Sequence, residues 1–155
     1  MSVVSDILAV IETRMAATET AAGVIRPIRH TDPAIADRVV VITHLDIEVE
    51  PELNHVGNPP AMAFVLPVVC AAIVNPSEDD NDPIDVLVAD FHSAMVKAIT
   101  ENNSANWYTF GDNSINAEIG PPIDYKPGDS SAHGSQFITR ITYRISETDP
   151  DTARG

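Results

Sequence analysis

The chain has 155 residues and a formal net charge of −14, from 23 acidic and 9 basic side chains. Its length suits one domain, and 44% hydrophobic with 21% charged residues excludes an intrinsically disordered chain. The charge argues against binding to nucleic acid or to an anionic membrane, because lysine and arginine provide most of that affinity. The charge still allows DNA to pass without sticking, and taken alone it is more simply explained by solubility.

Residues 2–17 predict an amphipathic helix that begins at a serine cap, Ser2 or Ser5. Glu12 and Arg14 fall outside the apolar stripe, so both are expected to face water. The stripe repeats every four residues and consists of Val3, Ile7, Ile11 and Met15, with Val4 and Leu8 beside it.

Apolar and β-branched runs predict four strands in the next part of the chain. Residues 61–74 are apolar on both faces, which is typical of a central strand in a covered sheet. Pro67 cannot donate to a strand ladder, so it indicates a bulge or an edge there. The four predicted strands are residues 24–29, 38–43, 46–50 and 61–74.

A second helix is predicted from residue 83 to about residue 100. Asp82 is expected to cap it, with Pro83 at the first helical position and Asp85 reaching back as in a capping box. Its apolar stripe consists of Ile84, Leu87, Val88, Phe91, Met95 and Ile99.

The last third of the chain predicts further strands. Residues 126–135 read as a flexible loop that orders on assembly, and residues from 147 onward read as a polar tail. The predicted strands are 107–110, 115–119, 123–125 and 136–145. Together the elements predict one α+β domain, residues 1–147, with a polar C-terminal tail, 148–155. We expect a mostly antiparallel sheet with two amphipathic helices on one face.

No catalytic, cofactor-binding or metal-binding residues are predicted. The five histidines show no metal-ligand cluster: the spacing of His44 and Asp46 would put both on one strand face, but no third ligand is suggested. The chain has no Gly-x-Ser-x-Gly elbow, no Walker loop and no Gly-x-Gly-x-x-Gly motif. His133 and Ser135 lie in a loop too flexible to hold a catalytic pair. Cys70 is the only cysteine and lies in an apolar run, which favours a buried, inert thiol.

The N-terminal residues lack a basic start followed by an apolar stretch, so no signal peptide is expected. No uncharged apolar segment is long enough to span a bilayer, and we expect a soluble chain made in a cytoplasm.

Three stretches of the chain resemble tail terminator proteins of tailed bacteriophages. They are Gly57-Asn58-Pro59-Pro60-Ala61-Met62-Ala63, then Thr109-Phe110-Gly111 with Ile115-Asn116-Ala117-Glu118-Ile119-Gly120, and Tyr143-Arg144-Ile145-Ser146-Glu147-Thr148-Asp149-Pro150. The resemblance implies an α+β subunit of a hexameric ring at the head-proximal end of the tail. Such a ring stops tail-tube polymerisation, joins the tail to the head connector and lets DNA pass through its centre, without catalysis or a cofactor. It implies a location in the virion tail or neck after assembly in the host cytoplasm.

Two groups of residues are candidates for roles in such a ring. Trp107, Tyr108 and Phe110 can equally serve as core packing. Arg140 and Arg144 can pair with acids across a subunit interface, and pairs within one chain or plain solvation explain them equally well. The acidic candidates for the channel or its rim are Glu48, Glu50, Glu52, Glu78, Asp79, Asp80 and Asp82. The candidates for the subunit interface are Trp107, Tyr108, Phe110, Arg140 and Arg144.

Other functions remain open at this point. The chain could be another head–tail connector component, such as a stopper. It could also be a small acidic hydrolase that uses carboxylates, or a ligand-binding module with Trp107 and Tyr108 in its pocket.

Overall fold

The computed structural model describes residues 2–18, 23–25, 38–54, 56–57, 60–76, 80–126 and 132–154. Within these residues the structure has two α-helices, two short 3₁₀ helices and eight strands, joined by turns and loops. The helices are α1 (Val3–Ala16), η1 (Pro51–Leu53), α2 (Ile84–Ile99) and η2 (Trp107–Thr109). The strands are β1 (Gly23–Ile25), β2 (Arg38–His44), β3 (Glu48–Val49), β4 (Ala61–Val74), β5 (Asn116–Ile119), β6 (Ile123–Tyr125), β7 (His133–Ser146) and β8 (Asp149–Ala153).

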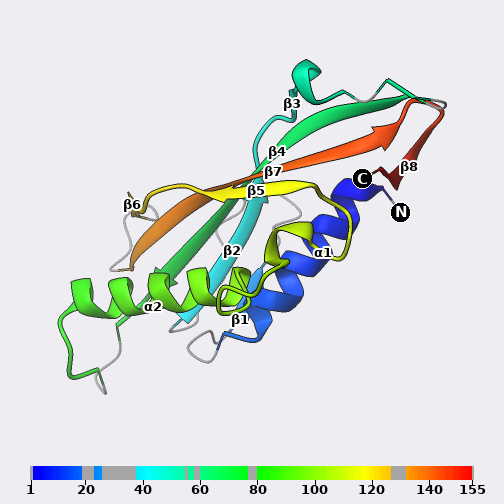
Figure 1. Ribbon diagram of the computed structural model, residues 1–155. Coiled ribbons are helices and arrows are strands. Elements are labelled where there is room, and N and C mark those ends of the chain that lie inside the picture. The colour runs from blue at the N-terminus through cyan, green and yellow to red at the C-terminus, as the bar shows by residue number, and fades with distance from the viewer. Residues whose placement is uncertain are drawn as a thin grey trace.

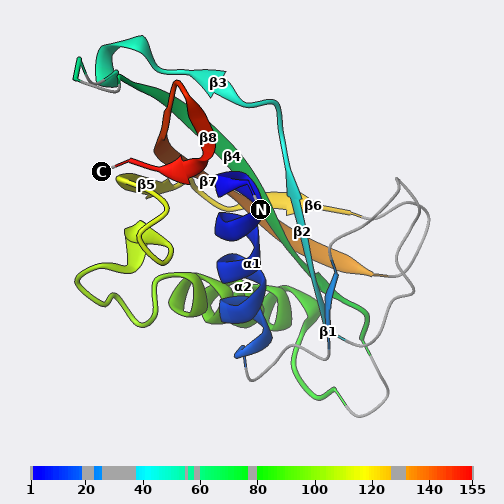
Figure 2. The ribbon, with the colours of Figure 1, turned by 90° about the vertical axis from the view of Figure 1, so that its right-hand side faces the viewer.

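One sheet contains all eight strands, and both α-helices pack against the same face of it (Figures 1 and 2). The order is β1-β2-β4-β7-β5, with β3 on β4 and with β6 and β8 on β7. Only the short β1–β2 pair is parallel, so the predicted α+β class with a mostly antiparallel sheet is confirmed. The long pair β4–β7 forms the spine of the sheet, with fourteen residues in each strand.

The core lies between the helices and the β4–β7 pair. Alternate residues of β4 face the helices, and the opposite residues of β7 face the same way because paired residues share a face. The large side chains buried there are Ile7, Ile11, Met15, Leu66, Phe91, Met95, Ile99, Phe110, Phe137 and Ile141. Both predicted stripes therefore supply core residues, although Ile84, Leu87 and Val88 of α2 are only half-buried.

The two helix caps differ from each other. The Ser2 side chain accepts a hydrogen bond from the Ser5 backbone N–H, as predicted for α1. The predicted cap of α2 is wrong: Pro83 is the N-cap residue, and no side chain caps the helix. Asp82 and Asp85 are exposed there, where water can bind the free N–H groups of the first turn.

Arg14 does not face water, contrary to the prediction from the stripe. Its side chain is only 9% exposed and donates from Nη1 to the carbonyls of Ile99 and Trp107, at 2.8 and 2.7 Å. The guanidinium carbon lies 4.7 Å from the centre of the Phe110 ring. Helical periodicity could not reveal this, because the partners come from the far end of α2 and the loop after it.

Pro67 lies within β4 without breaking it. On one side β4 pairs with β2 and β3, where His44 is opposite Val68 and Glu48 is opposite Val65. From His44 to Glu48 the chain advances four residues, whereas from Val68 to Val65 it advances three, so the β2–β3 side has one extra residue. The extra residue lies between β2 and β3, where the Leu45 N–H donates to the Pro67 carbonyl at 2.9 Å. The predicted bulge therefore occurs on the neighbouring edge, at the position where proline has no N–H to offer.

The predicted aromatic strand at residues 107–110 is wrong. Trp107–Thr109 form η2, and Phe110 has a left-handed backbone with φ of 45°. The Trp107 carbonyl accepts a bond from Arg14 rather than from a neighbouring strand. The aromatic residues of this stretch therefore pack against the core from a 3₁₀ turn after α2, and not from a β-strand.

The predicted loose tail is also wrong for residues 149–153, which form β8 against the end of β7. The Arg154 N–H donates to the Arg144 carbonyl at 2.8 Å, and Ala153 packs against the core. Backbone pairing stabilises this short edge strand in spite of its polar sequence. Residue 147 is therefore the start of a turn between strands.

Some predictions fall outside the described residues: most of the strand at 24–29 and residues 127–131 of the predicted loop. Of the helices that the structure describes, none has the length and hydrophobicity that crossing a membrane would need.

Candidate functional site

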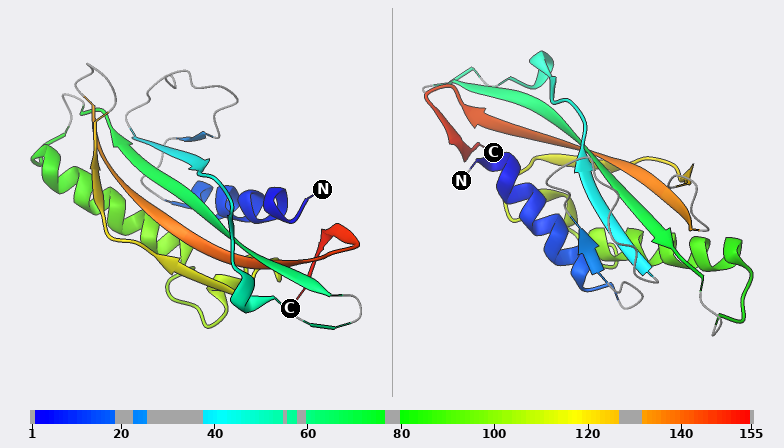
Figure 3. Two further views of the ribbon diagram at one scale, coloured as in Figure 1. Left: turned by 90° about the horizontal axis from the view of Figure 1, so that it is seen from above. Right: turned by 180° about the vertical axis from the view of Figure 1, so that it is seen from behind.

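The segment between β2 and β4 forms an exposed edge of the sheet. We call residues 45–54 the edge segment. It contains β3 and η1 and lies at the end of the sheet away from α2 (Figures 1 and 3). Backbone bonds attach it to β4, including Glu50 N–H to the Ala63 carbonyl at 3.0 Å. The Asn54 side chain accepts a bond from the Ala63 N–H at 2.8 Å, which fixes the end of the segment.

Large apolar side chains of the edge segment are exposed to solvent. They alternate with acidic residues in the sequence, so each exposed apolar side chain is next to a carboxylate in the chain. The exposed fractions are 49% for Leu45, 42% for Ile47, 59% for Val49 and 39% for Leu53. Among the residues that the structure describes, only Val56, Val86 and Ile123 are other large apolar side chains exposed to this degree. Exposed apolar side chains grouped in this way are typical of an interaction surface.

Two arginines of β7 attach the edge segment to the sheet. Arg140 forms an ion pair with Glu48, and the Arg144 side chain donates to the Leu53 carbonyl at 2.7 Å. Both predicted interface arginines thus have partners within one chain, the alternative that the sequence left open. The ion pair is half-exposed and contributes little stability, at most about 1 kcal/mol.

The acidic candidates lie in two separate places. Glu50 and Glu52 accompany Glu48 in the edge segment, beside the first half of β4. Asp80 pairs with Arg38 at 2.9 Å, and Arg38 is opposite Val74 at the other end of β4. These two places are roughly 30 Å apart at about 3.3 Å per residue along the strand. Asp82 is exposed before α2, while Glu78 and Asp79 lie outside the described residues.

The aromatic candidates gather around η2. Phe110 is fully buried and Trp107 and Tyr108 are half-buried, with ring centres 6.2 Å apart for Trp107–Phe110 and 6.5 Å for Trp107–Tyr108. Phe110 therefore packs inside one chain, and Trp107 and Tyr108 expose only part of their surface. Any interface role for these two stays a prediction.

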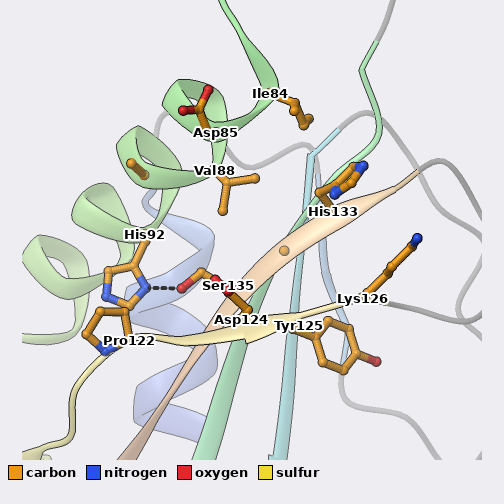
Figure 4. Close-up of a pocket in the computed structure, with 12 residues that line it drawn as sticks. Ile84, Asp85, Val88, His92, Pro122, Asp124, Tyr125, Lys126, His133 and Ser135 are labelled. Atoms are coloured by element: carbon orange, nitrogen blue, oxygen red, sulfur yellow. Dashed lines mark hydrogen bonds between the residues drawn. The ribbon is translucent and has the colours of Figure 1, made fainter.

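A groove lies between α2 and the β6–β7 edge of the sheet (Figure 4). Its volume is about 610 Å³, within the range of small-molecule and side-chain binding sites. Ile84, Val88 and Ala89 of α2 and Pro122 before β6 give it apolar walls. Its polar lining residues are Asp85, His92, Asp124, Lys126, His133 and Ser135.

His92 and Ser135 meet at the inner end of this groove. Ser135 Oγ lies 3.0 Å from His92 Nδ1, and Figure 4 shows His92 pointing from α2 toward β7. The His92 ring also contacts Phe137 edge-on, with ring centres 5.3 Å apart. The predicted flexible loop is wrong at residues 133–135, which belong to β7. Ser135 is buried in this strand rather than presented on a sharp turn, and it is opposite Asp124 of β6. This geometry attaches α2 to the sheet, and it lacks the exposed nucleophile of a hydrolase.

Burial lowers the pKa of His92 below its ordinary value of 6.5. The unfolded chain therefore binds this proton more readily than the folded chain does, and the free energy of unfolding falls as pH drops below 6.5. We expect His92→Gln to remove this part of the pH dependence. Urea unfolding between neutral and mildly acidic pH measures it.

The control for this prediction is His133→Gln, which removes an exposed histidine from the same groove. The other charged residues of the groove, Asp85, Asp124 and Lys126, are present in both variants, so the comparison isolates His92. An unchanged pH slope in His92→Gln would show that another group produces it.

Neither the cysteine nor the possible metal ligands among the described residues form a reactive site. Burial raises the pKa of the Cys70 thiol to about 12, so the thiol stays protonated and inert, as expected. Within the described ranges, no three His, Cys, Asp or Glu side chains gather closely enough to hold a metal ion.

Sequence reasoning missed two features of this surface. The acid–apolar alternation predicted the strand at residues 46–50, but it did not show that this strand lies at an exposed edge of the sheet. His92 and Ser135 are far apart in sequence, and no motif joins them. Only the packing of α2 over β7 brings them together.

No protein-family model and no curated protein sequence matches the chain. Among solved structures, the chain is similar to the sheath/tube terminator of an extracellular contractile injection system, PVC, in its extended state. The match has a TM-score of 0.49 and 12% sequence identity. It covers 98% of this chain and 61% of the other, so this chain spans about three fifths of that protein's length.

Proposed function

We propose that this protein is a structural tail terminator. In this proposal six copies form a ring at the head-proximal end of a phage tail. The ring stops polymerisation of the tail tube and joins the tail to the head connector. Its partners are further copies of itself, the tail tube protein and the connector protein, and it performs no catalysis.

The observation that carries the proposal is the exposed apolar side chains of the edge segment, whose strand β3 pairs with β4 alone among the described strands. A subunit that stays alone in water gains nothing from exposing Leu45, Ile47 and Val49, whereas assembly would bury them. The resemblance of three stretches of the sequence to tail terminator proteins is the reason for proposing a tail terminator ring rather than another assembly. A ring also requires contacts between two different surfaces of the subunit, repeated until the ring closes.

The acidic surface fits a channel through which DNA passes. A net charge of −14 repels phosphates, so a channel lined by carboxylates would not retain DNA. The proposed channel or rim residues are Glu48, Glu50, Glu52, Glu78, Asp79, Asp80 and Asp82. Arg140 partly neutralises Glu48, which leaves Glu50 and Glu52 as the stronger contributors from the edge segment.

Electron microscopy of particles assembled without this protein tests the proposal. We expect tails of uncontrolled length, or tails that do not join heads. Wild-type protein supplied in trans should restore normal particles. Normal joined particles in its absence would reject the proposal.

Two matched variants sharpen this experiment. Val49→Asp places a charge in the edge segment, and Val86→Asp places the same charge on an exposed valine of α2. We expect Val49→Asp to fail to restore normal particles and Val86→Asp to succeed. Equal rescue by both variants would argue against a role for the edge segment.

A further inference from the structure

We propose that the edge segment of one copy docks into the α2–β6 groove of the next copy. This inference rests on the proposed function, since it assigns the two surfaces that a closed ring needs. The occupant of the groove is therefore a second copy of this chain.

The two surfaces lie on opposite edges of the β4–β7 pair. Glu48 of the edge segment is opposite Val65 of β4, which is opposite Thr142 of β7. Asp124 of β6 is opposite Ser135 of β7, on the other side of the pair. These positions are roughly 23 Å apart along β7, at about 3.3 Å per residue. One chain therefore cannot fill its own groove, and the contact must run head to tail between copies.

The dimensions of the two surfaces match. Ile84, Val88 and His92 recur every four residues along the groove side of α2, which spans about 12 Å at 1.5 Å per residue. An extended chain from Leu45 to Val49 spans about 13 Å. The groove volume of about 610 Å³ is in the range that accommodates several side chains.

The chemistry of the groove favours aliphatic side chains between apolar walls. Ile84, Val88, Ala89 and Pro122 would cover Leu45, Ile47 and Val49. At the inner end the Nδ1 atom of His92 is already hydrogen-bonded to Ser135. β6 pairs with β7 alone among the described strands, so backbone groups on its other edge are available to an added strand.

Electrostatic repulsion opposes this contact, so its strength should depend on salt concentration. The edge segment carries carboxylates, the groove has two carboxylates, Asp85 and Asp124, against one lysine, Lys126, and each copy has a net charge of −14. Salt screens this repulsion, and apolar burial does not weaken with moderate salt. We therefore expect self-association to strengthen as sodium chloride rises, whereas an interface built on ion pairs would weaken.

Cross-linking between two variants that each gain one exposed cysteine tests the pairing. Val49→Cys marks the edge segment and Ala89→Cys marks the groove, and both positions are exposed. The native Cys70 is buried and does not react, so the background is low. The two full-length variants are mixed with a short bismaleimide at low and high salt, and the products are separated by mass. Ser93→Cys, at an exposed position of α2 that does not line the groove, replaces Ala89→Cys as control.

We expect dimers that contain one chain of each variant, and at least a tenfold lower yield for either variant alone or for the Ser93→Cys mixture. Dimers from Val49→Cys alone would indicate a symmetric contact and overturn the inference. Light scattering that shows oligomers without this cross-link, or a monomer at all salt concentrations, would also overturn it. The tail-length experiment does not depend on which surfaces pair, so it tests the proposed function separately.

Discussion

Replacing Phe110 with alanine is expected to lower the free energy of unfolding by about 3–5 kcal/mol, the usual cost of removing a buried phenylalanine ring. Phe110 is fully buried and joins three parts of the fold. Its ring lies edge-on to Trp107, under the guanidinium of Arg14, and within the core formed with the sheet. The cavity would lie where the loop after α2 meets α1, so neither helix could easily close it.

Urea unfolding followed by circular dichroism measures this loss, at a protein concentration low enough to keep the chain unassembled. Phe64→Ala is the matched control, because Phe64 is only half-buried and stacks on Tyr143. It should cost clearly less than Phe110→Ala. Equal losses in the two variants would contradict the central position given to Phe110.

Replacing Arg14 with methionine is expected to lower the free energy of unfolding by about 2–6 kcal/mol. Methionine keeps the apolar length of the side chain but removes the donor to the Ile99 and Trp107 carbonyls. Each part-buried carbonyl left without its partner costs about 1–3 kcal/mol. Burial also lowers the pKa of Arg14, while Glu101, at 3.0 Å, raises it.

Arg140→Met is the control for Arg14→Met. It removes the same group from an ion pair that is half-exposed on both sides, and should cost at most about 1 kcal/mol. Unfolding of both variants in urea measures the difference. A loss at Arg14 no larger than that at Arg140 would mean that water replaces the lost donor at the two carbonyls.

These two predictions concern the rigid body that presents the candidate surfaces. Arg14 and Phe110 connect α1, the end of α2 and η2, while the edge segment and the groove lie outside this cluster. Stability and assembly can therefore be tested with separate variants. A variant of the cluster should lose stability, whereas Val49→Asp should lose assembly and retain its fold.

The sequence by itself determined the elements whose pattern is local. The residues predicted for β4 are those observed, because a long apolar run fits only a central strand. The stripes of α1 and α2 predicted the helices and the face that each one buries. The missing N–H of Pro67 predicted a bulge, since that defect belongs to the residue itself.

The tertiary structure alone decided the features that depend on distant partners. Arg14 is buried because the carbonyls of Ile99 and Trp107 meet it, and residues 149–153 form a strand because β7 offers an edge. The edge segment and the groove exist as surfaces only once β4 and β7 have paired. Periodicity reports which side of an element is apolar, but not which other element will cover it, because that is settled by contacts between segments far apart in the chain.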